Sequence, residues 1–187
     1  MRVYVALGSN LDDPVSQVRA GAQALGKLPG THLVRCSSLY RTAPVGVTDQ
    51  PDFINAVCEA DTSLPAGALM QALLGIEQAH GRQRDIPGGP RTLDLDLLLY
   101  GEMVCHEPGL TLPHPRLHER AFVLYPLSEI APGLNIPGRG PVETLRAGCA
   151  GQAIERLAAG AERILAADER RLTEKLGTNK PKPDERS

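Results

Sequence analysis

Residues 92–100, TLDLDLLLY, alternate aliphatic and polar side chains as a half-buried β-strand does. Leucines occupy positions 93, 95, 97 and 99, whereas Asp94 and Asp96 fall on the opposite face. Because positions i and i+2 of a strand are about 6.5–7 Å apart at Cα, the two carboxylates repel each other unless a cation lies beside them or one holds a proton. The stretch therefore predicts a leucine-lined core on one side and a site for positive charge on the other.

The patterns before this stretch follow the order β-α-β-β-α-β. Strands are expected over residues 2–8, 32–40, 53–61 and 92–100, and helices over residues 12–25 and 63–81. This order predicts an α+β fold of the ferredoxin-like type, an antiparallel sheet with both helices on one face. With the leucines under the helices, the open side of the sheet carries Phe53, Asn55, Asp94 and Asp96. The long loops 42–51 and 82–91 flank that side, so a pocket is expected there.

The C-terminal third is less regular. Residues 100–112 predict a hairpin, and residues 112–132 predict one or two short helices. Apolar residues at helical spacing predict an amphipathic helix over 152–176, and the polar residues 177–187 are expected to be disordered. We therefore expect one domain over residues 1–158 and a helical and disordered extension over 159–187.

Composition excludes several classes of protein. A chain of 187 residues with 42% hydrophobic residues can bury one core, and a net charge of −2 gives no general basic surface for nucleic acid. The apolar runs are too short to span a membrane, and the N-terminus lacks the pattern of a secretory signal. The four cysteines form no CxxC pair, and Cys36 and Cys58 are expected to be free, small apolar residues within strands. A cytoplasmic monomer is expected.

Charged residues cluster around the acidic pair. Asp94 and Asp96 offer the hard oxygen ligands that Mg²⁺ prefers, and such an ion shares its ligands with substrate phosphates. Three arginines precede the pair and two follow it, with a histidine close by: Arg82, Arg84, Arg91, Arg116, Arg120 and His114. Together they indicate a site for a metal-bound polyphosphate. The alternative is a solvated strand face with unrelated surface charges. Neither GxxxxGK[ST] nor GxGxxG is present, so a glycine-rich phosphate loop is not expected.

Phe53 and Phe122 are the only phenylalanines of the chain. An aromatic ring on the open sheet face indicates a flat ligand, and Asn55 beside it can donate to and accept from the edge of a heterocycle. Alternatively, Phe53 packs under loop 42–51 and Phe122 packs in the core. Glu77, at the end of the second helix, is expected to pair with an arginine such as Arg82.

Six blocks in order resemble the 6-hydroxymethyl-7,8-dihydropterin pyrophosphokinases of folate biosynthesis. They are ALGSNL at 6–11, SSLYRTAPVG at 37–46, QPDFINAV at 50–57, IEQAHGRQR at 76–84, GPRTLDLDLLLY at 89–100 and LPHPRLHERAFVLYPLSEIAP at 112–132. The resemblance spans residues 1–158 and implies a ferredoxin-like fold. It also implies transfer of the β,γ-pyrophosphoryl group of ATP to the hydroxymethyl group of the pterin, with release of AMP.

The resemblance implies a role for each matching residue. Those implied to be catalytic are Arg82, Arg91, Asp94 and Asp96, the two aspartates binding two Mg²⁺ ions. Those implied to contact or support ATP are Glu77, Arg82, Arg84, Arg91, His114 and Arg120. Those implied to bind the pterin are Phe53 and Phe122 as a sandwich, with Asn55, Thr42 and Val45 at its edge.

The sequence departs from the family in two places. Many members carry an Arg-Trp pair before Gly-Pro-Arg, whereas this loop reads DIPGG over 85–89, and Gly109 stands where some members have arginine. A tryptophan lid over the pterin is therefore absent. Two alternatives to the pyrophosphokinase remain open from the residues: a non-catalytic ferredoxin-like domain that binds a small ligand, and a metal-dependent phosphohydrolase.

Overall fold

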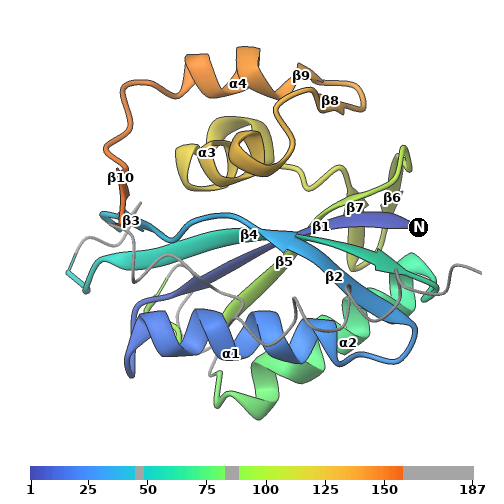
Figure 1. The fold of residues 1–187 in the computed structure, drawn as a ribbon, viewed down its shortest axis with the longest axis horizontal. Coiled ribbons are helices and arrows are strands. Elements are labelled where there is room, and N and C mark those ends of the chain that lie inside the picture. The colour runs from blue at the N-terminus through green and yellow to red at the C-terminus, as the bar shows by residue number, and fades with distance from the viewer. Residues whose placement is uncertain (45–48, 83–88, 158–187) are drawn as a thin grey trace, which may run out of the picture.

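The computed structural model describes residues 1–44, 49–82 and 89–157 (Figure 1). Within these residues the main sheet has the order β10-β3-β4-β1-β5, and β2 also pairs with β4. Every pairing in this sheet is antiparallel. The strands are β1 (Arg2–Ser9), β2 (Thr31–Cys36), β3 (Tyr40–Thr42), β4 (Phe53–Thr62), β5 (Asp94–Tyr100) and β10 (Glu155–Arg156). The expected α+β class with an antiparallel sheet is confirmed.

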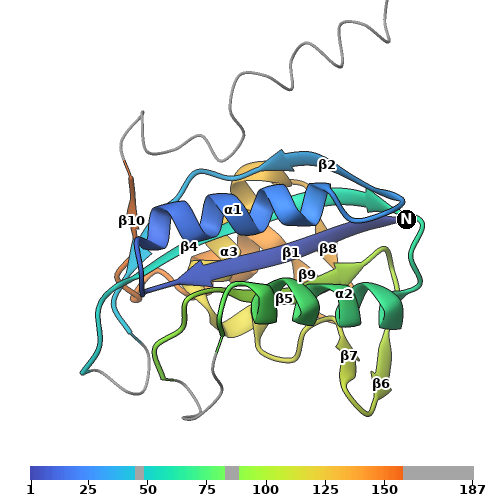
Figure 2. The ribbon, with the colours of Figure 1, turned by 90° about the horizontal axis from the view of Figure 1, so that it is seen from below.

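Helices cover both faces of this sheet (Figures 1 and 2). Helices α1 (Pro14–Gly26) and α2 (Ala66–Ala79) lie on one face, and α3 (Ala121–Ile130) and α4 (Val142–Gly148) on the other. Short hairpins and a 3₁₀ turn connect them: β6 (Cys105–Glu107), β7 (Leu110–Leu112), η1 (Leu117–Glu119), β8 (Asn135–Ile136) and β9 (Gly140–Pro141). The face that we expected to be open is therefore covered along part of its length by α3 and α4.

Two cores result, one on each side of the sheet. Leu93, Leu95 and Leu97 are buried with α1 and α2, as the alternation predicts. Leu98 and Leu99 are both buried in the second core, against α3 and α4. The reason is a register shift in the pairing of β1 with β5, where Tyr4 lies opposite Leu99 and the next residue of β1 lies opposite Leu97. Such a bulge adds one residue and reverses the parity, so our placement of Leu99 under the first two helices is wrong.

The expected strand over residues 32–40 is interrupted. Strands β2 and β3 pair with successive parts of β4, and the residues between them lack regular pairing. Ser37 spans this break, since its N–H donates to Val57 O at 2.9 Å and its Oγ accepts from Val57 N at 3.0 Å. The break keeps both segments on the same edge of β4.

Cys36 and Cys58 form a disulfide. They lie directly opposite each other on β2 and β4, with Cα atoms 4.1 Å apart. The expectation that both are free thiols is therefore wrong, because spacing along the chain does not reveal which residues face each other across a sheet. Within the described residues the free cysteines are Cys105 and Cys149.

The segment after α4 is not the start of a helix. Residues 152–157 contain no helix, and Glu155–Arg156 form β10 at the edge of the sheet beside β3. Our expected helix over 152–176 is thus wrong for residues 152–157, and the remainder of that range lies outside the described residues. Among the helices that the structure describes, none is long and apolar enough to cross a membrane.

Close packing of α1 on the sheet gives a test of the fold. A Cβ at buried Gly21 would lie 2.9 Å from Leu93 Cδ2, whereas a Cβ at exposed Gly75 of α2 meets nothing within 4 Å. We expect Gly21→Val to lower the free energy of unfolding by about 2 kcal/mol through overpacking. Gly75→Val is the matched control, with an expected change within about 0.5 kcal/mol. Urea unfolding of both variants measures the difference, and equal effects would contradict the packing.

Candidate active site

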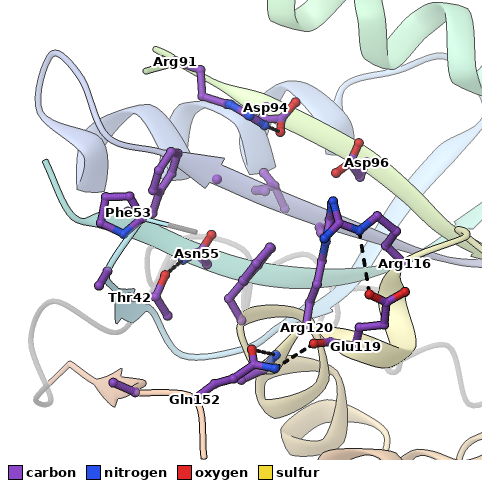
Figure 3. Close-up of a pocket in the computed structure, with 18 residues that line it drawn as sticks. Thr42, Phe53, Asn55, Arg91, Asp94, Asp96, Arg116, Glu119, Arg120 and Gln152 are labelled. Carbon is purple, nitrogen blue, oxygen red and sulfur yellow. Dashed lines mark hydrogen bonds and ion pairs between the residues drawn. The ribbon is translucent and has the colours of Figure 1, made fainter. Parts of the chain in front are cut away.

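A cavity of about 560 Å³ lies between the sheet and the N-terminal end of α3 (Figure 3). Its walls come from β1, β3, β4 and β5, from η1 and the start of α3, and from the segment after α4. The residues that line it are Ala6, Leu7, Gly8, Thr42, Ala43, Pro44, Phe53, Asn55, Arg91, Asp94, Asp96, Arg116, Glu119, Arg120, Ala121, Phe122, Gln152 and Ala153. The pocket predicted on this side of the sheet is therefore present. The sequence did not predict that η1, the start of α3 and the segment after α4 would cover it.

The central strand β1 sets the spacing across the floor. Gly8 lies opposite Asp94 on one neighbouring strand and opposite Asn55 on the other. A Cβ on Gly8 would lie 3.2 Å from Asn55 Oδ1. The absence of a side chain at this position therefore leaves the space between the acidic pair and the amide open to a ligand.

Asp94 is held by two arginines. Its Oδ1 pairs with Arg82 Nη1 and its Oδ2 pairs with Arg91 Nη1, and the Asp94 side chain is 12% exposed. Arg82 also pairs with buried Glu77, as the sequence predicts, and Glu77 accepts from Leu95 N at 2.8 Å. Glu77 does not line the cavity and instead links the end of α2 to the start of β5.

The pKa values of the two aspartates are shifted in opposite directions. Burial alone would raise the pKa of Asp94, but the charges of Arg91 and Arg82 outweigh it and lower this pKa below its usual value. Burial, followed by the negative charge of Asp94, raises the pKa of Asp96 to about 6. The buried Glu77 carboxyl likewise has a raised pKa, mainly because of burial. Burial is thus the main cause of both raised pKa values, and the paired arginines offset it only at Asp94.

His114 and Arg120 lie on the other side of Asp96. His114 Nε2 is 4.0 Å from Asp96 Oδ2, and His114 does not line the cavity. Burial, and next the charge of Arg120, lower the pKa of His114 to about 4, so the imidazole is neutral at pH 7. Burial and then Arg116 lower the pKa of Arg120. The cations around Asp96 at neutral pH are thus arginines.

The aromatic end of the cavity pairs rings with guanidinium groups. Arg91 lies over the Phe53 ring at 5.8 Å from its centroid, and Arg120 over the Phe122 ring at 5.4 Å. Asn55 Nδ2 donates to Thr42 Oγ1 at 2.9 Å. Both rings are partly exposed and line the cavity, and Phe122 also packs against the second core.

The cavity brings together most of the predicted residues. Those that line it are Thr42, Phe53, Asn55, Arg91, Asp94, Asp96, Arg116, Arg120 and Phe122. Arg82, Glu77 and His114 lie beside it through their contacts with the aspartates or with β5. Val45 and Arg84, and with them the DIPG part of the lid loop, lie outside the described residues. Sequence reasoning gave no role to Glu119 or Gln152, and no spacing pattern marks either residue.

The acidic pair fits a divalent cation only with help from a ligand. The described residues contain no group of three or more His, Cys, Asp or Glu side chains placed to hold a metal ion. Asp94 and Asp96 nevertheless supply hard oxygen donors to the cavity. This donor set suits Mg²⁺, which takes one or two carboxylates and completes its coordination with water and phosphate oxygens.

Comparison with known families gives a clear result. Residues 4–132 match the model of the 7,8-dihydro-6-hydroxymethylpterin-pyrophosphokinase family. The chain belongs to this family. The match includes every residue to which we gave a candidate role in the site, and it ends before β10 and Gln152.

Individual relatives agree with the family match. The chain is 49% identical over 156 residues to a 2-amino-4-hydroxy-6-hydroxymethyldihydropteridine pyrophosphokinase of Pseudomonas aeruginosa, covering 83% of this chain and 96% of the relative. A Haemophilus influenzae protein of the same name is 48% identical over 134 residues, which cover 72% of this chain and 84% of the relative.

Solved structures agree on the fold. The Plasmodium falciparum HPPK-DHPS matches with a TM-score of 0.63 at 11% identity, covering 79% of this chain and 44% of that one. Our chain therefore spans less than half of that protein, and the likeness concerns the fold alone.

The raised pKa of Asp96 predicts a pH-dependent stability. The ionised carboxyl destabilises the fold when no metal is bound. This effect is complete above about pH 6 and is lost as the pH falls from there toward 3.8, the ordinary pKa of the carboxyl. We expect Asp96→Asn to raise the melting temperature at pH 8 and to have a much smaller effect at pH 4. Thermal unfolding in the presence of a chelator measures this. An Asp96→Asn effect that is equal at both pH values would contradict the assigned charge state.

Proposed function

We propose that this protein transfers the β,γ-pyrophosphoryl group of ATP to the hydroxymethyl group of 6-hydroxymethyl-7,8-dihydropterin. The observation that carries the proposal is that one cavity combines acidic, basic and aromatic groups. Asp94 and Asp96 line it together with Phe53 and Phe122, and Arg91 both pairs with Asp94 and lies over the Phe53 ring. A triphosphate and a flat heterocycle need such neighbouring sites, and the names of the bacterial relatives give the same reaction.

In this reaction the hydroxymethyl oxygen attacks the β-phosphorus of ATP. A new O–P bond forms, the bond between the β-phosphorus and the α,β-bridging oxygen breaks, AMP leaves, and the hydroxyl proton is released. Transfer of this kind depends on alignment and on neutralisation of phosphate charge rather than on covalent chemistry by the protein. The rigid floor of β1, β4 and β5 supports the alignment, since the acidic pair and Asn55 flank the same strand.

The arginines have a second role in this proposal. Arg82 and Arg91 neutralise Asp94 in the ligand-free structure. When the triphosphate enters, we propose that they turn from Asp94 to the phosphate oxygens, with Arg84 and Arg120 in support. Asp94 and Asp96 would hold two Mg²⁺ ions, which would neutralise phosphate charge. His114, neutral at pH 7, is suited to donate or accept a hydrogen bond at ATP.

The rings define the pterin end. We propose that the pterin lies between Phe53 and Phe122. It would either displace the guanidinium groups that lie over these rings or stack together with them. Asn55, already bonded to Thr42, would read the edge of the heterocycle together with the backbone near Val45. A ligand stacked on two rings gains both apolar burial and favourable ring geometry.

We also propose the finer features of the molecule. The order of β1, α1, β2, β4, α2 and β5 supports a ferredoxin-like core, and the pyrophosphokinase domain is proposed to span residues 1–158, followed by an extension over 159–187. The protein is proposed to act as a monomer in the cytoplasm, where ATP is present.

The decisive experiment is product analysis. The chain is incubated with ATP, Mg²⁺ and 6-hydroxymethyl-7,8-dihydropterin, and AMP and the pterin diphosphate are expected in equal amounts. Formation of ADP would overturn the pyrophosphoryl transfer. Release of phosphate without the pterin would instead favour a phosphohydrolase, and ligand binding that needs no Mg²⁺ and gives no product would favour a non-catalytic binding domain.

Asp94→Asn tests the proposed role of the Asp94 carboxylate in the reaction. We expect turnover to fall by about three orders of magnitude, because the variant loses a charge that acts on the transferred group. Asp61→Asn is the matched control, since Asp61 is exposed at the far end of β4 and pairs only with Arg2 among the ion pairs of the described residues. Rates of AMP formation measure both, and an Asp94→Asn enzyme as fast as the control would contradict the assignment.

A further inference from the structure

We propose that Gln152 is a positioning residue that holds the Glu119–Phe122 turn at the aromatic end of the cavity. Its side-chain Oε1 accepts from Ala121 N at 2.9 Å, and its Nε2 donates to Glu119 O at 2.7 Å (Figure 3). One amide thereby fastens the backbone on both sides of Arg120. This inference deepens the proposed function and rests on it for the identity of the substrate.

The hydrogen bond to Ala121 N caps the start of α3, which the N-cap residue itself does not cap with its side chain. Ala121 is the first residue of α3, and the residue before it, Arg120, makes no side-chain capping bond. The first N–H groups of a helix have no partner within the helix, and side chains that accept from them stabilise the helix start. Gln152 supplies this cap from a segment 31 residues further along the chain.

The position of the turn matters because of what it carries. Arg120 and Phe122 both line the cavity, and the Arg120 guanidinium lies 5.4 Å from the centroid of the Phe122 ring. Ala121 between them is buried, so its amide has no access to water as a substitute partner. Fixing Glu119 O and Ala121 N therefore fixes the direction in which both side chains leave the backbone.

The segment that bears Gln152 is itself anchored. Gln152 N donates to Cys149 O at 3.0 Å, and β10 pairs with β3 three residues later. Arg156 Nε donates to Ser38 Oγ at 2.9 Å, and Leu157 N donates to Leu39 O at 2.9 Å. Gln152 is thus held on both sides, which lets a single side chain act as a fixed support.

Three substitutions separate the contributions of the two hydrogen bonds that the Gln152 side chain makes. Gln152→Met keeps the size of the side chain and removes both hydrogen bonds, whereas Gln152→Glu keeps the acceptor for Ala121 N and removes the donor to Glu119 O. Glu155→Gln is the matched control, because Glu155 lies on the same segment and pairs at 3.5 Å with exposed Arg41, away from the cavity.

The first measurement does not depend on activity. Hydrogen exchange of the Ala121 amide in the full, ligand-free chain is expected to be at least about tenfold faster in Gln152→Met than in the unmodified protein, and unchanged in Glu155→Gln. Gln152→Glu is expected to retain most of the protection. Unchanged exchange at Ala121 in Gln152→Met would overturn the inference, even if the chain proved not to release AMP.

The second measurement uses the reaction. Loss of a helix cap corresponds to roughly a fivefold effect, which we expect as a rise in KM for the pterin in Gln152→Met, with kcat within about twofold. Gln152→Glu should fall between this variant and the unmodified enzyme. A lower melting temperature with an unchanged KM would show a purely structural role and overturn the inference. Absence of AMP from the unmodified chain would instead refute the proposed function.

Discussion

The ion pairs of Asp94 with Arg82 and Arg91 are the contacts on which the rest of the site depends. Arg82 follows α2, Arg91 precedes β5, and Glu77 ties both elements together through Arg82 and Leu95 N. Without these cations, several buried carboxyls would share one region and raise one another's pKa values. The arginines thus lower the cost of assembling the acidic floor before any ligand arrives.

This arrangement also explains why two neighbouring aspartates need not behave alike. Asp94 receives both arginines and keeps its charge, whereas Asp96, with only a neutral histidine at 4.0 Å and arginines further away, has a pKa raised to about 6. A cation that binds the pair would compete with arginines at one carboxyl and with a proton at the other. Binding of metal and polyphosphate together resolves both conflicts, because the phosphates accept the displaced arginines.

Sequence reasoning succeeded where a repeating pattern governs the structure. Alternation along residues 92–97 placed the leucines in the core and the aspartates at the cavity, and the same parity placed Phe53 and Asn55 there. It failed at Leu99, because the bulge that moves this residue to the other face depends on the pairing with β1. The family resemblance implied roles for further residues such as Glu77 and His114, but it gave none to Glu119 or Gln152, which line the cavity.

Other features depend on contacts between distant segments, which no local pattern encodes. The disulfide of Cys36 with Cys58 follows from sheet register, and the cover of α3 and α4 follows from an apolar face that the sheet would otherwise leave exposed. The strand β10 has only two residues, too few to show alternation. The helical spacing of the residues that follow therefore led us to begin the expected helix at residue 152, which is too early.

Different contacts hold the acidic and the aromatic residues of the cavity in place. Asp94, Asp96 and Asn55 stand on adjacent strands of one sheet, so hydrogen bonds between strands fix their separation. Phe53 and Phe122 come from opposite layers, and the gap between their rings depends on how α3 is fastened to the sheet.

The far end of α3 is fastened by Glu129. This residue accepts from Ser38 Oγ at 2.7 Å and from Tyr40 Oη at 2.8 Å, which accounts for the polar residues of the SSLY and SEIAP blocks. The near end is held by Gln152, outside the residues that match the family model. The sheet positions the acidic pair, whereas the side-chain hydrogen bonds of Glu129 and Gln152 position α3 and with it Phe122. Substitutions that remove these hydrogen bonds therefore change the distance between the two rings while leaving the geometry of the acidic pair intact.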